Sequence, residues 1–143
     1  MSTAFQDISA ALSANLNTYA TANSVPVAWE NVKYLPVTGA KYLRETLIPA
    51  STEQVELGAA GIDETLGIYQ VDAFTLADSN LGKSEAQILV DGVADQFKRG
   101  SVLTYNGVNV RIRKVSAGRG AIDGAWYMIP ITIEFRSYTQ PRV

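Results

Sequence analysis

Residues 77–84, Ala-Asp-Ser-Asn-Leu-Gly-Lys-Ser, have the spacing of a phosphate-binding loop, because they follow an apolar run and end in Gly-Lys-Ser. Such a loop would surround phosphates with backbone N–H groups and bring the Lys83 ammonium to them. The motif needs a glycine where this chain has Ala77, and a separate acidic strand end for magnesium. The acidic candidate, Asp91, falls inside the helix that Ser84 begins. We therefore interpret these residues as a polar turn with Ser84 as a helix N-cap.

The rest of the chain offers no catalytic group of the usual kinds. It contains no histidine and no cysteine, so the common general base, the common metal ligand and the thiolate nucleophile are all missing. The carboxylate pairs Asp63–Glu64 and Asp91–Asp95 have no neighbours that would activate them, and we interpret them as solvated. No Gly-x-Ser-x-Gly elbow is present. The sequence predicts a protein that is not an enzyme and holds no metal or cofactor.

A basic cluster late in the chain is the best candidate for binding, and it consists of Arg111, Arg113, Lys114 and Arg119. These residues fall on one expected strand and the loop after it, where they would suit an acidic partner protein or a phosphate backbone. They would equally suit the solvated face of a hairpin, and both interpretations stay open. Sequence-specific reading of nucleic acid is not expected, because no helix presents a basic face with base-reading side chains.

Charge is distributed unevenly along the 143 residues, although the net charge is only −2. Residues 1–95 hold four Lys/Arg and twelve Asp/Glu, whereas residues 96–143 hold eight and two. Such asymmetry is compatible with nucleic-acid binding, with simple solvation of both parts, or with an acidic face of one subunit meeting a basic face of the next.

The elements that would position these groups are organised around residues 66–76, the longest β-like run in the middle of the chain. Apolar residues occupy both parities of this run, whereas a strand with one wet face would alternate. We therefore expect it to be covered on both faces, by a helix, another sheet or another subunit.

Two amphipathic helices are predicted. The first spans residues 3–20, with Thr3 and Gln6 as a capping box and a buried stripe of Phe5, Ile8, Leu12, Leu16 and Tyr19. The second spans residues 84–99 and should end at Gly100. Its expected buried stripe consists of Ile88, Leu89, Val93, Ala94 and Phe97.

Before the central run, short strands are expected at residues 25–30, 42–48 and 53–58, the second of them stopped by Pro49. The loop at 31–40 is flanked by aromatic residues, which we interpret as structural rather than as a binding surface. These short runs and the Gly-bearing link after them predict an antiparallel pairing with the central strand.

The final third of the chain predicts a hairpin and a long strand. Asn106-Gly107 between two β-like runs is a strong hairpin signal, because both residues tolerate positive φ. A loop follows at residues 116–121. Residues 126–137 then alternate, with Tyr127 to Phe135 inward at odd positions, and Pro130 predicts an edge or a bulge there.

Together these elements predict one α+β domain over residues 1–143. Its mostly antiparallel β-sheet would be packed by an N-terminal helix and a second mid-chain helix. The first residues show no basic and apolar signal-peptide pattern, and no run approaches the roughly 20 apolar residues that span a bilayer. We therefore expect a soluble, cytoplasmic protein with no membrane partner.

Several blocks of the sequence resemble the phage tail terminator-like proteins. They are Lys41–Ala50 (Lys-Tyr-Leu-Arg-Glu-Thr-Leu-Ile-Pro-Ala), Leu66–Phe74 (Leu-Gly-Ile-Tyr-Gln-Val-Asp-Ala-Phe), the helix ending in Phe97, and Gly124-Ala125-Trp126-Tyr127 leading into Ile129-Pro130-Ile131. Their order and spacing are similar to that family along nearly the whole chain. They are packing motifs, so the resemblance implies a fold and a role rather than a catalytic site.

The resemblance implies a homohexameric ring, assembled in the bacterial cytoplasm and located at the neck end of the virion tail. The ring would cap the last ring of tail tube protein, stop tube polymerisation and present a surface to head-completion (neck) proteins. Phage DNA would pass through it without sequence-specific contact. Asn106-Gly107 and the loop at Gly118-Arg119-Gly120 are our candidates for contacts with the tube.

Two other functions stay open. Within phage assembly the chain would be a head–tail connector or a tail-tube subunit, although the long hairpin typical of tube proteins is not evident in the sequence. From a different class, it would be a monomeric binding module that uses the basic patch at 111–119.

Overall fold

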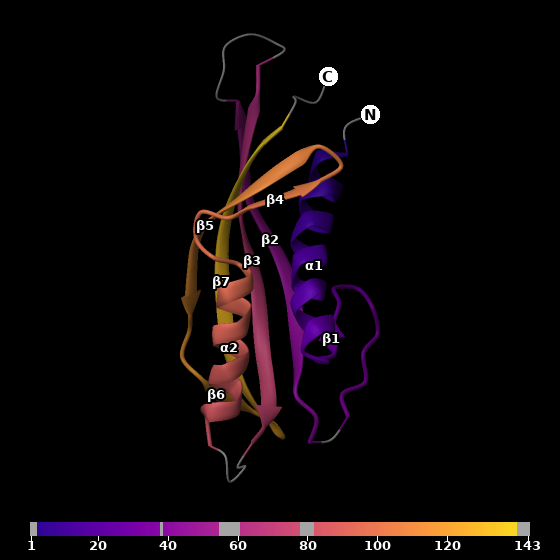
Figure 1. Cartoon of the computed structure of the whole chain (residues 1–143), viewed down its shortest axis with the longest axis vertical. Coiled ribbons are helices and arrows are strands. Elements are labelled where there is room, and N and C mark those ends of the chain that lie inside the picture. The colour runs from indigo at the N-terminus through magenta and orange to yellow at the C-terminus, as the bar shows by residue number, and fades with distance from the viewer. Residues whose placement is uncertain (1–2, 38, 55–60, 78–81, 140–143) are drawn as a thin grey trace.

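The structure is a computed structural model that describes residues 3–37, 39–54, 61–77 and 82–139 (Figure 1). Within these ranges the chain forms two helices and seven strands. In order they are α1 (Ala4–Ala22), β1 (Val27–Ala28), β2 (Tyr42–Gln54), β3 (Asp63–Leu76), α2 (Ser84–Gln96), β4 (Val102–Tyr105), β5 (Val108–Ala117), β6 (Ala121–Asp123) and β7 (Trp126–Thr139).

The strands form one sheet in the order β1-β2-β3-β7-β5-β4, and β6 pairs with β7 beyond the end of β5. Every pair is antiparallel except β1 with β2. β3 and β7 pair along their entire lengths, from Asp63 opposite Thr139 to Leu76 opposite Trp126. The predicted fold class is confirmed: the protein is α+β, with two helices and a mostly antiparallel sheet.

Both helices pack on one face of the sheet and bury its inward side chains (Figure 1). On β7 the inward residues have odd numbers, as the two-residue period of a strand requires, so the predicted inward face from Ile129 to Phe135 is confirmed. The core between helices and sheet includes Ile8, Leu12, Leu16, Tyr69, Val71, Leu89, Val93, Phe97, Ile131 and Ile133.

The central strand is covered on both faces over only part of its length. Residues 71–75 are all buried, because the face turned away from the helices carries an aromatic cluster there. In this cluster the Tyr42 ring stacks on Phe74 with centroids 4.6 Å apart and receives the edge of Trp126 at 5.1 Å. Over residues 63–70 the burial instead alternates, so within the single chain the prediction is confirmed only for residues 71–75. Cover of the remainder by another subunit stays a prediction.

The beginning of α1 differs from the prediction. Thr3 and Gln6 form no capping box, since no side chain caps the helix and the Thr3 hydroxyl instead donates to the Asp7 carboxylate at 2.7 Å. Asp7 is only 6% exposed, whereas Phe5, expected in the buried stripe, is 47% exposed. The physical reason is the β4–β5 hairpin: the Asn106 side-chain amide lies 3.4 Å from both Asp7 carboxylate oxygens and covers them.

The second helix ends earlier than expected, and its predicted buried stripe is confirmed at Leu89, Val93 and Phe97 but not at Ile88. It stops at Gln96, with Phe97 as C-cap, so Gly100 lies beyond the helix, where its N–H donates to the Ile112 carbonyl at 2.7 Å. The buried helix residues are Ala86, Leu89 and Val93, followed by Phe97. At 100° of rotation per residue, Ile88 lies on the side of the helix away from these buried residues, and it is 65% exposed. Its predicted place in the core is therefore wrong.

The predicted hairpin is confirmed, with positive φ angles at Asn106 (50°) and Gly107 (79°) joining β4 to β5. The prediction of an edge or bulge at Pro130 is wrong for the strand as a whole, because β7 lies between β3 and β5. Locally, however, the Pro130 carbonyl accepts the Gly118 N–H at 2.7 Å, in the gap between β5 and β6. The missing donor of Pro130 faces the same gap, so no ladder bond is lost.

Gly67 provides a test of packing between β3 and β7. A Cβ at this position would lie 2.6 Å from Cζ of the buried Phe135 ring and 3.1 Å from the Ile48 carbonyl oxygen. We predict that Gly67→Ala lowers the free energy of unfolding by about 1–3 kcal/mol, the usual cost of overpacking. Urea denaturation of Gly67→Ala, Phe135→Leu and the double variant measures it. The double variant should lose less than the sum of the singles, and strict additivity would show that the ring does not oppose the methyl group.

Candidate interaction surfaces

The most prominent feature beyond the core is an arm formed by Ile48–Gln54 of β2 and Asp63–Ile68 of β3, with the end of β7 paired beside it (Figure 1). Residues 48–54 of β2 are all exposed. The sequence pattern does not predict this arm, because Pro49 indicates the end of a strand. β2 instead continues through Pro49, whose missing N–H lies on the free edge of the strand, and changes register between Pro49 and Ser51.

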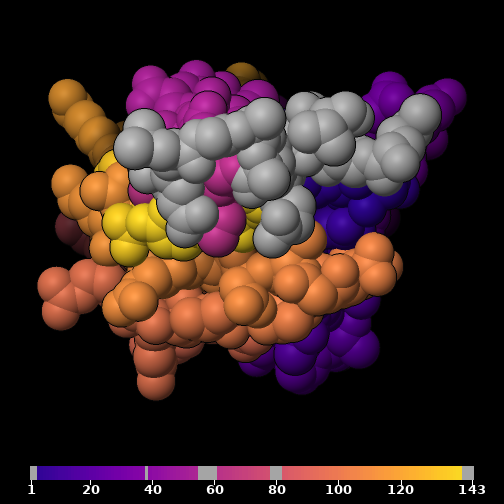
Figure 2. All heavy atoms as spheres, turned by 90° about the horizontal axis from the view of Figure 1, so that it is seen from above, coloured from indigo at the N-terminus to yellow at the C-terminus, as the bar shows by residue number. Residues whose placement is uncertain are grey.

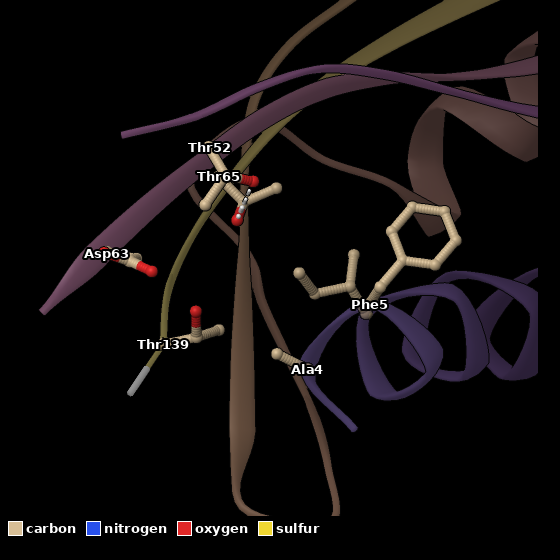
Figure 3. A pocket seen from close by; sticks show the side chains of 7 residues that line it. Ala4, Phe5, Thr52, Asp63, Thr65 and Thr139 are labelled. Carbon is tan, nitrogen blue, oxygen red and sulfur yellow. Dashed lines mark hydrogen bonds between the residues drawn. The ribbon is translucent and has the colours of Figure 1, made fainter. Parts of the chain in front are cut away.

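The inward face of the arm is polar. Where β3 covers the core it carries Tyr69, Val71 and Ala73 inward, but nearer the tip the inward residues are Thr65 and Asp63. Figure 3 shows Thr65 beside Thr52 of β2, with their hydroxyls 3.1 Å apart, above the start of α1. A cavity of about 50 Å³ separates these threonines from the helix. The helix therefore supports the base of the arm without burying it in apolar contacts.

The free edge of β2 is blocked at the base of the arm. The Leu47 N–H points away from β3 and donates to Oε1 of Glu30 at 2.7 Å. Pro49, two residues later in β2, also faces this free edge and has no backbone N–H that could donate to another strand. Blocking by a carboxylate and a proline is typical of strand edges that must not pair with other sheets at random. This edge therefore does not invite strand addition between Leu47 and Pro49.

The four basic residues predicted for binding all lie exposed, but they do not form one cluster. Arg111 lies opposite Arg136 of β7, and Lys114 lies opposite Glu134. Arg113 occupies a register shift between these two pairs, and Arg119 lies in the short loop before β6. Arg136 is engaged with Glu64 at 3.9 Å and with the Tyr138 ring at 5.3 Å. The hairpin face is thus a mixed polar surface with an excess of positive charge.

The two loops predicted for tube contacts both pack against the chain itself. Asn106, at the tip of the β4–β5 hairpin, contacts Asp7, and Figure 2 shows this hairpin as an orange ridge that reaches α1. The loop at 118–120 is held to β7, because Gly118 donates to Pro130 and Gly120 leaves no room for a Cβ beside the Tyr127 ring. Gly107 occupies open space at the hairpin tip. Neither loop projects as the arm does.

A buried carboxylate, which the sequence analysis also missed, ties α1, β2 and β3 together. Glu45 is 9% exposed and accepts hydrogen bonds from the Tyr69 hydroxyl at 2.6 Å, the Ser13 hydroxyl at 2.7 Å and the Glu30 N–H at 3.1 Å. The sequence signal that could have predicted a buried carboxylate is the charge of Glu45 among apolar residues on an expected strand. Burial, and secondly the nearby carboxylate, raises the pKa of the Tyr69 hydroxyl far above its ordinary value of 10.0.

The phosphate-loop candidate at 77–84 lies partly outside the described residues, which leave out 78–81. Among the described residues, the groups weighed for chemistry do not assemble into a site. The predicted N-cap Ser84 is instead the first residue of α2, where the N-cap is Lys83 and no side chain caps the helix. Asp91 and Asp95 are exposed on α2, as expected for a solvated pair. No group of three or more possible metal ligands occurs among the described residues. In the parts of the chain that the structure describes, no helix is long and apolar enough to cross a membrane.

Comparison with known proteins identifies the family. A sequence profile described as phage tail terminator protein matches residues 7–135. The chain belongs to the phage tail terminator family. No curated protein matches the sequence. This terminator is similar to a solved structure that carries no functional description, with 26% identity, a TM-score of 0.76, and coverage of 96% of this chain and 98% of the other.

A second solved structure places the same fold in a virus-like particle. It is a chain from the virion of a native gene transfer agent particle, with 17% identity, a TM-score of 0.59, and coverage of 99% of this chain and 100% of the other. At this identity the likeness shows the fold alone. Family membership establishes a structural role in a phage tail, a location in the virion tail and assembly with other virion proteins.

The buried Glu45–Tyr69 pair gives a prediction with a defined pH dependence. The folded state keeps the Tyr69 proton, whereas the unfolded chain releases it above pH 10, so this stabilisation is complete below pH 10 and declines as the pH rises further. We predict that Tyr69→Phe is destabilised by about 1–3 kcal/mol at pH 7, because Glu45 loses a donor. Above pH 10 the stability of Tyr69→Phe should fall less steeply with pH than that of the parent protein. The two slopes should differ by up to about 1.4 kcal/mol per pH unit.

Denaturant unfolding between pH 7 and pH 11 measures both effects. Tyr138→Phe is the matched control, because Tyr138 is 49% exposed and should change neither the stability at pH 7 nor the slope. Parallel pH curves for the parent protein and Tyr69→Phe would contradict the assignment of this proton.

Proposed function

We propose that this protein forms a ring, most simply a homohexamer, that caps the tail tube, stops tube polymerisation and provides the surface for joining the head. The observation that carries the proposal is the match of the tail terminator family along the chain. The proposed unit of assembly is the whole of residues 1–143 as one domain. DNA would pass through the ring without sequence-specific contact, and no cofactor or catalytic residue takes part.

The exposed arm supports the capping step. Its strands extend beyond both helices, its inward face is polar, and residues 48–54 are all exposed in the described part of the chain. Its outward face carries Ile48, which is 43% exposed, opposite Ile68. An arm of this kind suits contact with another protein better than the two loops first considered, since those pack on their own chain. We therefore assign the tube contact to the arm.

Termination also requires that the opposite surface does not accept another tube ring. The mixed polar face with Arg111, Arg113 and Lys114 suits a different partner, such as the neck protein. A surface with excess positive charge selects an acidic partner and sets the rate and orientation of docking more than the affinity. The terminator would thus have two dissimilar ends, one for the tube and one for the neck.

A tail-tube subunit is the second candidate, and the structure favours it more than the sequence did. A long hairpin is not evident in the sequence, but the antiparallel strands β2 and β3 have 13 and 14 residues. The two functions differ in one measurable property: a tube subunit adds to its own kind repeatedly, whereas a terminator stops after one ring.

The deciding measurement is assembly with and without tube protein. We predict that the purified chain gives single rings, of mass six times the 15.4 kDa protomer, in native mass spectrometry and negative-stain images, or forms such rings at tube ends. Added to polymerising tube protein, it should shorten the tubes as its concentration rises. Stacked tubes of the chain alone would identify a tube subunit instead. Unchanged tube length, together with a strict monomer, would refute the capping function.

A charge change in the arm tests where the cap contacts the tube. We predict that Ile48→Glu, which places a charge on the exposed outward face, leaves the protomer folded but weakens tube shortening at least tenfold. Tyr105→Glu is the matched control, because Tyr105 is 46% exposed but lies on the β4–β5 hairpin. Equal loss by both variants would argue against the arm as the contact.

A further inference from the structure

The most exposed large apolar side chains of the described residues lie in one loop, on α2 and on β6. Val32 (60%), Leu35 (75%) and Val37 (65%) lie in the loop between β1 and β2, which we call the apolar loop. Ile88 (65%) lies on α2 and Ile122 (62%) on β6. Single exposed apolar residues need no explanation, but three within six residues of one loop indicate an interaction surface.

The apolar loop is held firmly by its own anchors. The Tyr34 ring packs on Tyr42 with centroids 5.0 Å apart, and the Val32 N–H closes a turn onto the Trp29 carbonyl at 3.1 Å. Glu30, at the start of the loop, is fixed by bonds to Glu45 and to Leu47. Because Tyr34 is the loop residue that packs inward, the aliphatic side chains of the loop point outward and stay exposed. The surface is therefore preorganised rather than collapsed onto the core.

The outer face of α2 has complementary chemistry. Ile88 is flanked on the exposed side of the helix by Asp91 and Asp95. The helix carries three acidic residues and no Lys or Arg, whereas residues 31–41 carry Lys33 and Lys41 and no acidic residue. Ile122 lies at the same end of the molecule, because the turn after β6 bonds to Ala77, just beyond the end of β3. Each surface thus pairs apolar side chains with charge of one sign.

The two surfaces lie at the same height along the molecule but on different sides, with the lower part of α1 between them in Figure 1. The apolar loop therefore cannot pack against α2 of its own chain in this arrangement. A second copy, rotated about an axis along the molecule, would bring the apolar loop of one protomer to α2 of the next. Such a head-to-tail contact closes into a ring when the rotation closes.

We propose that the ring interface is formed by the apolar loop of one protomer docking on the outer face of α2 in its neighbour, with Val32, Leu35 and Val37 against Ile88 and Lys33 beside Asp91 and Asp95. The inference deepens the proposed function and rests on it, since it names the contact that holds the ring together. It also gives a physical reason for the one departure from expectation on α2, the exposed Ile88, and a partner for the exposed pair Asp91–Asp95.

Cysteine cross-linking tests this contact directly, because the chain has no cysteine of its own. Leu35→Cys mixed with Ile88→Cys should give a cross-linked dimer under mild oxidation, and the double variant should give a ladder up to the full ring. Phe5→Cys mixed with Leu35→Cys is the control, since Phe5 is exposed at the far end of α1. Leu35→Cys alone should not link to itself.

The outcomes separate this inference from the proposed function. If native mass spectrometry shows rings but Leu35→Cys and Ile88→Cys do not cross-link, the proposed interface is overturned and the proposed ring still stands. Self-linked Leu35→Cys would show a two-fold contact and would also overturn it. Links to tube or neck protein in place of the neighbouring protomer would assign the loop to that partner. Absence of any oligomer, free or at tube ends, would refute both.

Charge reversal gives an independent readout. Lys33→Glu and Asp91→Lys should each weaken protomer association about three- to fivefold, and the two together should recover most of the loss, as for an exposed ion pair. Lys114→Glu is the control for net charge and should leave association unchanged. Sedimentation over a concentration series at low salt measures these constants, and losses that simply multiply in the double variant would contradict the pairing.

Discussion

The structure depends on a mismatch of length between the sheet and the helices that cover it. A helix of 19 residues is about 28 Å long and one of 13 residues about 20 Å, whereas a strand of 14 residues extends about 46 Å. The helices supply the apolar partners of the inward face of the sheet, and because they are shorter than β3 they can cover only part of that face. β3 and β7 nevertheless stay paired along their full length, since each supplies the other's backbone hydrogen bonds. The uncovered remainder is the arm.

The side chains along β3 follow this constraint. Where the helices lie on the strand, the inward positions are large and apolar, and Gly67 makes room for the Phe135 ring at the boundary. Beyond that ring the inward position is Thr65, whose hydroxyl has a partner in Thr52. At the base of the arm the edge is closed by Glu30 and Pro49. The sequence therefore keeps the arm extended and soluble without a helix over it, and restricts where another chain can pair with it.

Much of the fold could be predicted from the sequence, because the signals that succeeded are local. The hairpin at Asn106-Gly107 needs only two residues that tolerate positive φ, and the faces of β7 follow from strict alternation. The failures are positions where a distant part of the chain decides. Pro49 is compatible with a continuing strand because it lies at a free edge, and Asp7 is buried because the tip of a hairpin 99 residues later covers it. Single-sequence patterns carry neither fact.

The candidate surfaces were harder to predict than the fold, for a related reason. Arg111 and its basic neighbours looked like a cluster in sequence, but the register places Arg111 opposite Arg136 and Lys114 opposite Glu134, which spreads and partly compensates their charge. The most informative residues were instead those that seemed misplaced. An apolar residue on the exposed side of a helix, such as Ile88, leaves most of its side chain in water in the isolated protomer. Because this protein assembles with other virion proteins, the physical reason for such a residue is to be sought in a contact with another subunit, where burying it removes apolar surface from water.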